Sequence, residues 1–224
     1  TFLNKYKDFL DKSADDGELT VVLNTDDQSK VGTTTTDANG NITKDISLLR
    51  TKNVSKVNIW GIEADYKYHF SERNKGLSLT TSASLIKGEN KTNGENLDSI
   101  NPFTAVSNLE YKFPSNKFIA SITNTYVAAP NPSATYLKGV LQRNGTYDTT
   151  NVFVPKPFVS TDLLVKYIPT ENFMADIGIY NIFDKKYYLW SDIRSNGLIG
   201  LDDIAYQRYA QPGISIKAGF KWRF

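Results

Sequence analysis

The chain has 224 residues and a formal net charge of +2, and it is rich in aromatic side chains, with 13 Tyr, 12 Phe and 3 Trp. The near balance of charge and the scattered Lys and Arg residues argue against a nucleic-acid-binding protein. The absence of cysteine excludes disulfides, thiolate metal sites and a cysteine nucleophile. No apolar run approaches the roughly 20 residues that a membrane-spanning helix needs, although a hydropathy count of this kind does not detect membrane strands.

Apolar and polar residues alternate with a period of two along most of the chain. This alternation, in segments of about ten residues, is typical of the strands of a transmembrane β-barrel. We expect strands, in chain order, at 2–10, 58–70, 77–85, 105–113, 118–126, 159–167, 173–182 and 214–224. The last is the clearest, because every second residue from Ile214 to Phe224 is apolar and Ser, Lys, Gly or Arg stands between them.

The connectors between these strands alternate in length. Short turns are expected at 71–76, 114–116 and 169–172, and long connectors near 11–56, 87–102, 128–157 and 183–211. Outer-membrane barrels have tight periplasmic turns, long extracellular loops and aromatic girdles at both interfaces. We therefore expect residues 1–224 to be part of an all-β, antiparallel transmembrane barrel, with the long connectors outside the cell and outer-membrane lipid around the strands.

Several segments resemble TonB-dependent outer-membrane receptors. Residues 181–188 (NIFDKKYY) resemble the N-hydrophobic-F-D-K-x-Y segment on the penultimate strand of these receptors, and 58–63 (NIWGIE) are similar to a recurring strand opening. The ending Trp222-Arg-Phe224 resembles the signal read by the barrel-assembly machinery, so Trp222 and Phe224 are expected to serve assembly. Residues 190–194 (WSDIR), 208–213 (RYAQPG) and 2–9 (FLNKYKDF) are similar to the haem, haemoglobin, transferrin and lactoferrin receptor branch.

The resemblance implies the last eight or so strands of a barrel of about 22 strands, with an N-terminal plug that is not in this chain. The chain is accordingly expected to be a fragment. The implied protein is an active transporter of the Gram-negative outer membrane that binds haem, a haemoprotein or a haemophore at its outer loops. Its energy would come from the TonB–ExbB–ExbD complex. Haem would be transported rather than permanently bound, and neither a metal site nor enzyme activity is expected.

The long connector at 183–211 carries the candidate ligand- and partner-binding residues. Tyr, Trp and Arg dominate binding hot spots, Arg suits haem propionates, and aromatic rings suit the porphyrin. A loop-ordering role through an internal Asp–Arg pair is the alternative. The candidates are Tyr187, Tyr188, Trp190, Asp192, Arg194, Arg208 and Tyr209.

Haem iron could also be held by a tyrosinate. Further candidates for this role are the loop tyrosines at 136, 147 and 206, although packing explains most loop tyrosines equally well. His69, the only histidine, is expected on the polar face beside a short turn, where a polar contact is a better explanation than haem ligation.

Two other functions stay open at this stage. The chain could belong to a receptor for another cargo, such as a ferric siderophore, transferrin iron, zinc or cobalamin. It could also form a self-standing barrel of eight strands, but the interior of so narrow a barrel must be filled by side chains, and Ser78, Ser82 and Ser84 are small. The sequence contains neither a nucleophile-elbow serine motif nor a glycine-rich phosphate loop.

Overall fold

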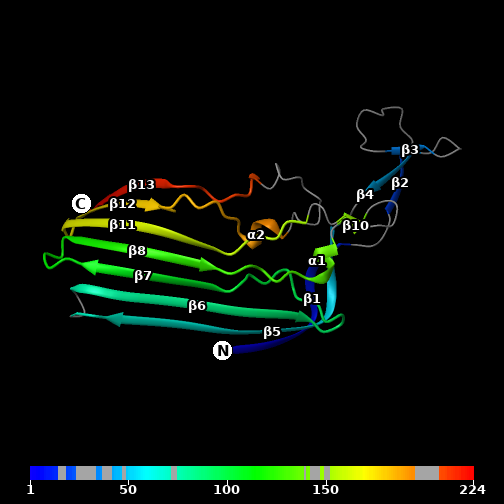
Figure 1. The fold of residues 1–224 in the computed structure, drawn as a ribbon, viewed down its shortest axis with the longest axis horizontal. Helices are drawn as coiled ribbons and strands as arrows, with labels where there is room; N and C mark the ends of the chain where they lie inside the picture. The colour runs from blue at the N-terminus through cyan, green and yellow to red at the C-terminus, as the bar shows by residue number, and fades with distance from the viewer. Residues whose placement is uncertain are drawn as a thin grey trace.

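The computed structural model describes residues 1–14, 19–23, 34–36, 42–46, 49–71, 75–138, 140–141, 147–148, 152–194 and 207–224. Its main feature is one antiparallel sheet of eight strands, whose order in space follows their order in the chain (Figure 1). The strands are β1 (Phe2–Ala14), β5 (Leu49–His69), β6 (Gly76–Asn90), β7 (Thr104–Lys112), β8 (Phe118–Val127), β11 (Phe158–Thr170), β12 (Phe173–Tyr180) and β13 (Ser215–Trp222). The sheet is open, because β1 and β13 form its two edges, so these strands do not close a barrel by themselves.

Short turns and long connectors lie at opposite ends of this sheet (Figure 1). The C-terminus lies at the end with the short turns, and the small elements of the long connectors lie at the other end. These elements are β2 (Leu19–Leu23), β3 (Thr34–Thr36), β4 (Ile42–Ile46), α1 (Ala134–Lys138), β9 (Val140–Leu141), β10 (Tyr147–Asp148) and α2 (Trp190–Ile193). The predicted alternation of connector lengths is thus confirmed. Within the described ranges, no helix has the length and hydropathy needed to cross a membrane.

The strand register separates an apolar face from a polar face. Leu109 pairs with Ile122, which in turn pairs with Leu163. This apolar row continues through Ile179 to Ile216. Aromatic rings gather on the apolar face toward the short turns, where Phe118 stacks on Tyr167 with ring centroids 4.7 Å apart. A broad exposed apolar face bordered by aromatic rings is the surface that a lipid bilayer covers.

The strands next to the first long connector extend further than the alternation predicted. β1 and β5 stay paired as far as Ala14 and Leu49, which leaves a connector at 15–48 rather than 11–56. β6 likewise continues to Asn90. Lipid imposes the alternation only across the bilayer, whereas the backbone hydrogen bonds of a ladder can continue in water without it.

Two motifs lie at different places in the strands from those expected. β12 ends at Tyr180, because Asn181 has a φ of 50° and leaves the extended conformation. Residues 181–188 therefore follow the penultimate strand instead of lying on it. Residues 58–63 lie in the middle of β5 and do not open it.

Candidate functional site

The turn that follows β12 is held by the side chain of Asn181, which is only 3% exposed. Its Nδ2 donates to the carbonyl oxygens of Lys185 (2.9 Å) and Pro212 (3.1 Å), and its Oδ1 accepts from the Lys185 N–H (2.9 Å). Its own backbone N–H donates to Asp162 Oδ1 on β11 (2.8 Å). One asparagine thus joins β11 to both ends of the long connector at 181–214.

Asp184 completes this turn. Its Oδ1 accepts a hydrogen bond from the Ile214 N–H (2.9 Å), and its N–H donates to the carbonyl oxygen of Asn181 (2.8 Å). A Cβ on residue 213 would collide with Asp184 Oδ1, so only glycine fits there without a shift. Asn181, Asp184 and Gly213 in the family-like motifs are therefore explained by local loop structure.

The same connector contributes to a buried cluster at the long-connector end of the sheet. Tyr136, Trp190 and Ile193 are 1%, 4% and 0% exposed, and the Tyr136 and Trp190 rings meet edge to face with centroids 5.0 Å apart. Tyr188 and Tyr209 pack against this cluster from the outside. The Tyr136 hydroxyl donates to the carbonyl oxygen of Phe153 (2.8 Å), so this tyrosine serves packing and is not available to bind iron.

Asp98 fastens this cluster to a second and a third connector. Its carboxylate accepts hydrogen bonds from the N–H (2.7 Å) and the hydroxyl (2.8 Å) of Ser133. Its carbonyl oxygen accepts from Trp190 Nε1 (2.8 Å), and the Arg194 guanidinium donates to the carbonyl oxygens of Asp98 and Ser99. We call Asp98, Ser133, Trp190 and Arg194 the three-loop junction, because they join the connectors at 91–103, 128–157 and 181–214.

Burial determines the electrostatics of the three-loop junction. Loss of solvent raises the pKa of the Asp98 carboxyl above its ordinary value of 3.8, and the hydrogen bonds from Ser133 oppose this rise only in part. The guanidinium of Arg194 also lowers this pKa, but less than Ser133 does. The carboxylate is thus a partly desolvated acceptor that depends on Ser133.

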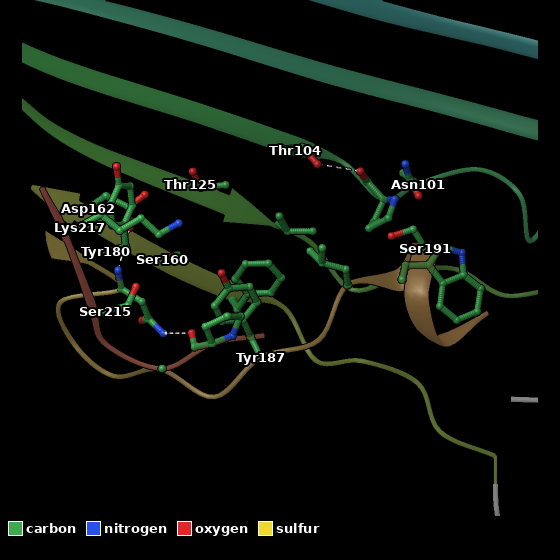
Figure 2. A pocket seen from close by; sticks show the side chains of 18 residues that line it. Asn101, Thr104, Thr125, Ser160, Asp162, Tyr180, Tyr187, Ser191, Ser215 and Lys217 are labelled. Atoms are coloured by element: carbon green, nitrogen blue, oxygen red, sulfur yellow. Dashed lines mark hydrogen bonds between the residues drawn. The ribbon is translucent and has the colours of Figure 1, made fainter. Parts of the chain in front are cut away.

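A cavity of about 470 Å³ lies beside the three-loop junction, between the polar face of the sheet and the connector at 181–214 (Figure 2). Lys217, Asp162 and Tyr180 gather at one end of the cavity, and Asn101 and Ser191 lie at the other. Lys217 Nζ lies 5.0 Å from the centroid of the Tyr180 ring. The cavity has aromatic walls, and one ammonium group (Lys217) and one carboxylate (Asp162) lie at the same end of it, so it can accept a flat ligand that carries a polar edge.

The structure divides the predicted binding residues into two groups. Tyr187 and Trp190 line the cavity, and Tyr187 stacks on Phe158 with ring centroids 4.1 Å apart. Trp190 is nevertheless almost fully buried, which favours a packing role over direct contact with a large partner. Arg208 is exposed, and it is the predicted cationic residue that a partner protein can reach.

Loop ordering, the alternative role, describes Arg194 and Asp192 better. Arg194 orders the loops by donating to backbone carbonyl oxygens of another connector. Asp192 accepts from Gln211 Nε2 (2.9 Å) and from the Ser191 hydroxyl (3.0 Å), which links α2 to the end of its own connector. Tyr206 and the side chain of Tyr147 lie outside the described residues.

Sequence reasoning missed Asp98 and Ser133, because they are 35 positions apart and lie in irregular segments without a motif. Asn181 and Gly213 belong to motifs noted in the sequence, but the sequence did not reveal that they hold the connector at 181–214 in place. His69 lies on the polar face of β5, next to the turn that leads to β6, as expected. Among the described residues, no group of three or more His, Asp or Glu side chains could hold a metal ion.

Comparisons with known proteins agree with this architecture. A family model described as "TonB dependent receptor-like, beta-barrel" matches residues 2–182. "Hemoglobin-binding protein A" of Haemophilus influenzae is 27% identical over all of this chain, which covers 22% of that protein. "Hemoglobin-haptoglobin utilization protein B" of Neisseria meningitidis serogroup C is 25% identical over all of this chain, which covers 28% of that protein.

The fold also matches a solved structure. The ferric enterobactin receptor PfeA of Pseudomonas aeruginosa superimposes on 99% of this chain with a TM-score of 0.64, and the match covers 28% of that receptor. The two sequences are 18% identical, so this likeness shows the fold and not the ligand.

Proposed function

Because this chain belongs to the TonB-dependent receptor-like β-barrel family, we propose that it is part of an outer-membrane receptor that captures a haem-carrying protein and imports its haem. The observation that supports this cargo most strongly is the similarity to two proteins named for haemoglobin binding or haemoglobin–haptoglobin utilization. Neither name describes an enzyme, and we propose no catalytic role for the chain. The chain spans about a quarter of each relative's length, so the proposal concerns the whole receptor.

The geometry suggests how the long connectors take part in capture. The three-loop junction holds three connectors in one arrangement at one end of the sheet. Preorganised loops bind better because less conformational entropy is lost on association. Exposed side chains of the connector at 181–214, among them Phe183 (75% exposed) and Arg208, are available to a protein partner. In this proposal they contact the haemoprotein, while Trp190 and Arg194 keep the loops in place.

Haem released from its carrier would meet the cavity beside the junction. The rings of Tyr180 and Tyr187 offer flat apolar surface, and Lys217 offers a cation for a propionate. Haem is cargo in this proposal and not a resident cofactor. Transport would draw on the TonB–ExbB–ExbD complex, through parts of the receptor outside residues 1–224.

A ferric siderophore is the second candidate cargo, because the fold matches a siderophore receptor. That match shows the fold alone, whereas the similarity to haemoglobin receptors includes sequence along the whole chain. A self-standing eight-stranded barrel disagrees with the open sheet, which ends at β1 and β13.

Growth under iron limitation tests the proposal. The intact receptor would be expressed in a Gram-negative strain that lacks its own haem and siderophore receptors. We expect growth with haemoglobin as the sole iron source and no growth with ferric enterobactin. Growth with enterobactin alone, at normal receptor levels in the outer membrane, would overturn the proposed cargo.

A further inference from the structure

The apolar, lipid-facing side of the sheet carries one row of polar side chains. Asn124 on β8 faces the same side as Ile122, because residues two apart on a strand share a face. Asn124 pairs with Ser107 on β7 and with Thr161 on β11, and Ser107 pairs with Thr81 on β6. These strands lie away from both edges of the sheet, so strands that extend the barrel at β1 or β13 do not cover the row.

The row lies within the apolar band and not beyond it. From Phe118, near the short turn, β8 advances six residues to Asn124, and Tyr126 follows two residues later. A strand that rises about 3.3 Å per residue and is tilted by about 40° places Asn124 about 15 Å above Phe118. The apolar band of such barrels is about 25 Å tall, so lipid tails surround Asn124 in a monomer.

Hydrogen bonds within the row leave part of the Asn124 amide without a partner. The Thr161 hydroxyl donates to Asn124 Oδ1 (2.8 Å), and the Thr81 hydroxyl donates to that of Ser107 (3.4 Å). Among the described residues the Asn124 side chain makes no other hydrogen bond. Asn124 is also exposed on this face. Lipid tails offer no hydrogen bond, so a half-satisfied amide at this depth is costly until a partner completes it.

The side chains beside the row permit close approach of another surface. The next row toward the long connectors contains Ala64 on β5, Ala83 on β6 and Ala105 on β7. Small residues let two membrane-embedded surfaces come close enough for their polar groups to meet. An amide has both donors and an acceptor, so two Asn124 side chains related by a twofold axis can each donate to the other. The face is therefore self-complementary.

We propose that this face binds a second copy of the receptor, with the two Asn124 amides hydrogen-bonded to each other across a twofold axis normal to the membrane. A twofold interface presents the same patch from both copies, so the second copy brings the matching amide with it. Pairing removes both amides from lipid, and the alanine row brings the two barrel walls together.

Analytical ultracentrifugation of the purified intact receptor in a neutral detergent tests this interface. Asn124→Leu should raise the dissociation constant of the dimer at least fivefold, and Asn124→Gln, which keeps an amide, should raise it less. Ala105→Phe should also weaken the dimer, because it keeps the face apolar but blocks close approach. The matched control is Ile177→Leu, since Ile177 is an exposed residue (50%) on the apolar face of β12, two strands from β8, and this change should leave the constant unaltered.

The folded fraction in outer membranes separates loss of the dimer from a folding defect. Leucine suits lipid better than asparagine does, so Asn124→Leu should not lower this fraction. The chain has no cysteine, which permits a second measurement in native membranes, on a receptor without other cysteines. Oxidation should link two copies through Asn124→Cys and not through Ile177→Cys.

A receptor that stays monomeric would overturn the proposal. So would equal dissociation constants for the unaltered and Asn124→Leu receptors, or equal crosslinking at the two cysteine positions. Loss of a copurifying lipid from a monomeric Asn124→Leu receptor would also overturn it, because the amide would then bind a lipid and not a second copy.

Discussion

Asp98 is the residue on which the arrangement of the long connectors depends most. It accepts two hydrogen bonds from Ser133 through its carboxylate and one from Trp190 through its backbone oxygen. Asp98→Ala leaves the Ser133 donors without their acceptor, at a cost of about 1–3 kcal/mol in a buried setting. Asp98→Asn keeps an acceptor for the Ser133 N–H and should cost less.

The pH dependence of the three-loop junction follows from the pKa of Asp98. Burial raises this pKa in the folded protein, so the folded state binds the proton more tightly than the opened state. Stability is then highest below the ordinary pKa and falls as the pH rises through the raised value. We expect acidification to tighten the junction, and Asp98→Asn to abolish this dependence. Hydrogen exchange at 133–137, followed as the pH is lowered from neutral to the ordinary pKa of 3.8, measures both effects. Faster exchange at the lower pH, after correction for intrinsic rates, would contradict the expectation.

The sequence predicted which aromatic and cationic residues of 183–211 could bind a ligand, but not which of them are buried. The burial of each side chain depends on which other connector it contacts. Trp190 meets Asp98 across 92 positions. No periodicity in a loop encodes such a contact, so the burial of Trp190 and the exposure of Arg208 could not be predicted from the sequence.

At the scale of the strands, the alternation of faces makes a sharp prediction on β8. Ile122 faces the apolar side, between Leu109 and Leu163, and its neighbour Ser121 faces the polar side. Ile122→Arg should destabilise the barrel by about 2–4 kcal/mol if it lies near the bilayer midplane. Ser121→Arg, the matched control, should be tolerated. The folded fraction of each variant in outer membranes is measured from its heat-modifiable gel mobility. An equal loss of folded receptor in Ile122→Arg and Ser121→Arg would refute the assignment of faces.

The strands were predictable because lipid imposes a rule on the sequence. Residues that face the bilayer are predominantly apolar, so the centres of β7, β8 and β11 were expected within a residue or two of where they lie. The ends of β1, β5 and β6 were not, because that rule no longer applies beyond the bilayer. The small sheet formed by β2, β4 and β3 has short strands in a polar segment and left no alternation to detect.

For the molecule as a whole, the open edge at β13 matters for assembly of the barrel. Within the described sheet β13 pairs only with β12, and an unpaired edge must be held until the barrel closes. We propose that Trp222 and the exposed Phe224 supply the recognised end. Deletion of Phe224 should lower the amount of receptor in the outer membrane severalfold, while each assembled receptor binds haemoglobin normally. Immunoblots of outer membranes, combined with binding per receptor, measure this, and normal amounts with lost binding would argue against it.

If the three-loop junction orders a haemoprotein-binding surface, haemoglobin should bind more weakly to cells that display the Arg194→Gln receptor. Arg194 donates to backbone carbonyl oxygens of the connector at 91–103, so its loss should act through loop order. At matched surface levels we expect binding to weaken by about 1–3 kcal/mol, with faster proteolysis of 181–214, and Lys166→Gln, a control on the polar face of β11, to behave like the unaltered receptor. If the Arg194→Gln receptor binds haemoglobin with wild-type affinity although its connector is cleaved faster, the junction does not order the binding surface.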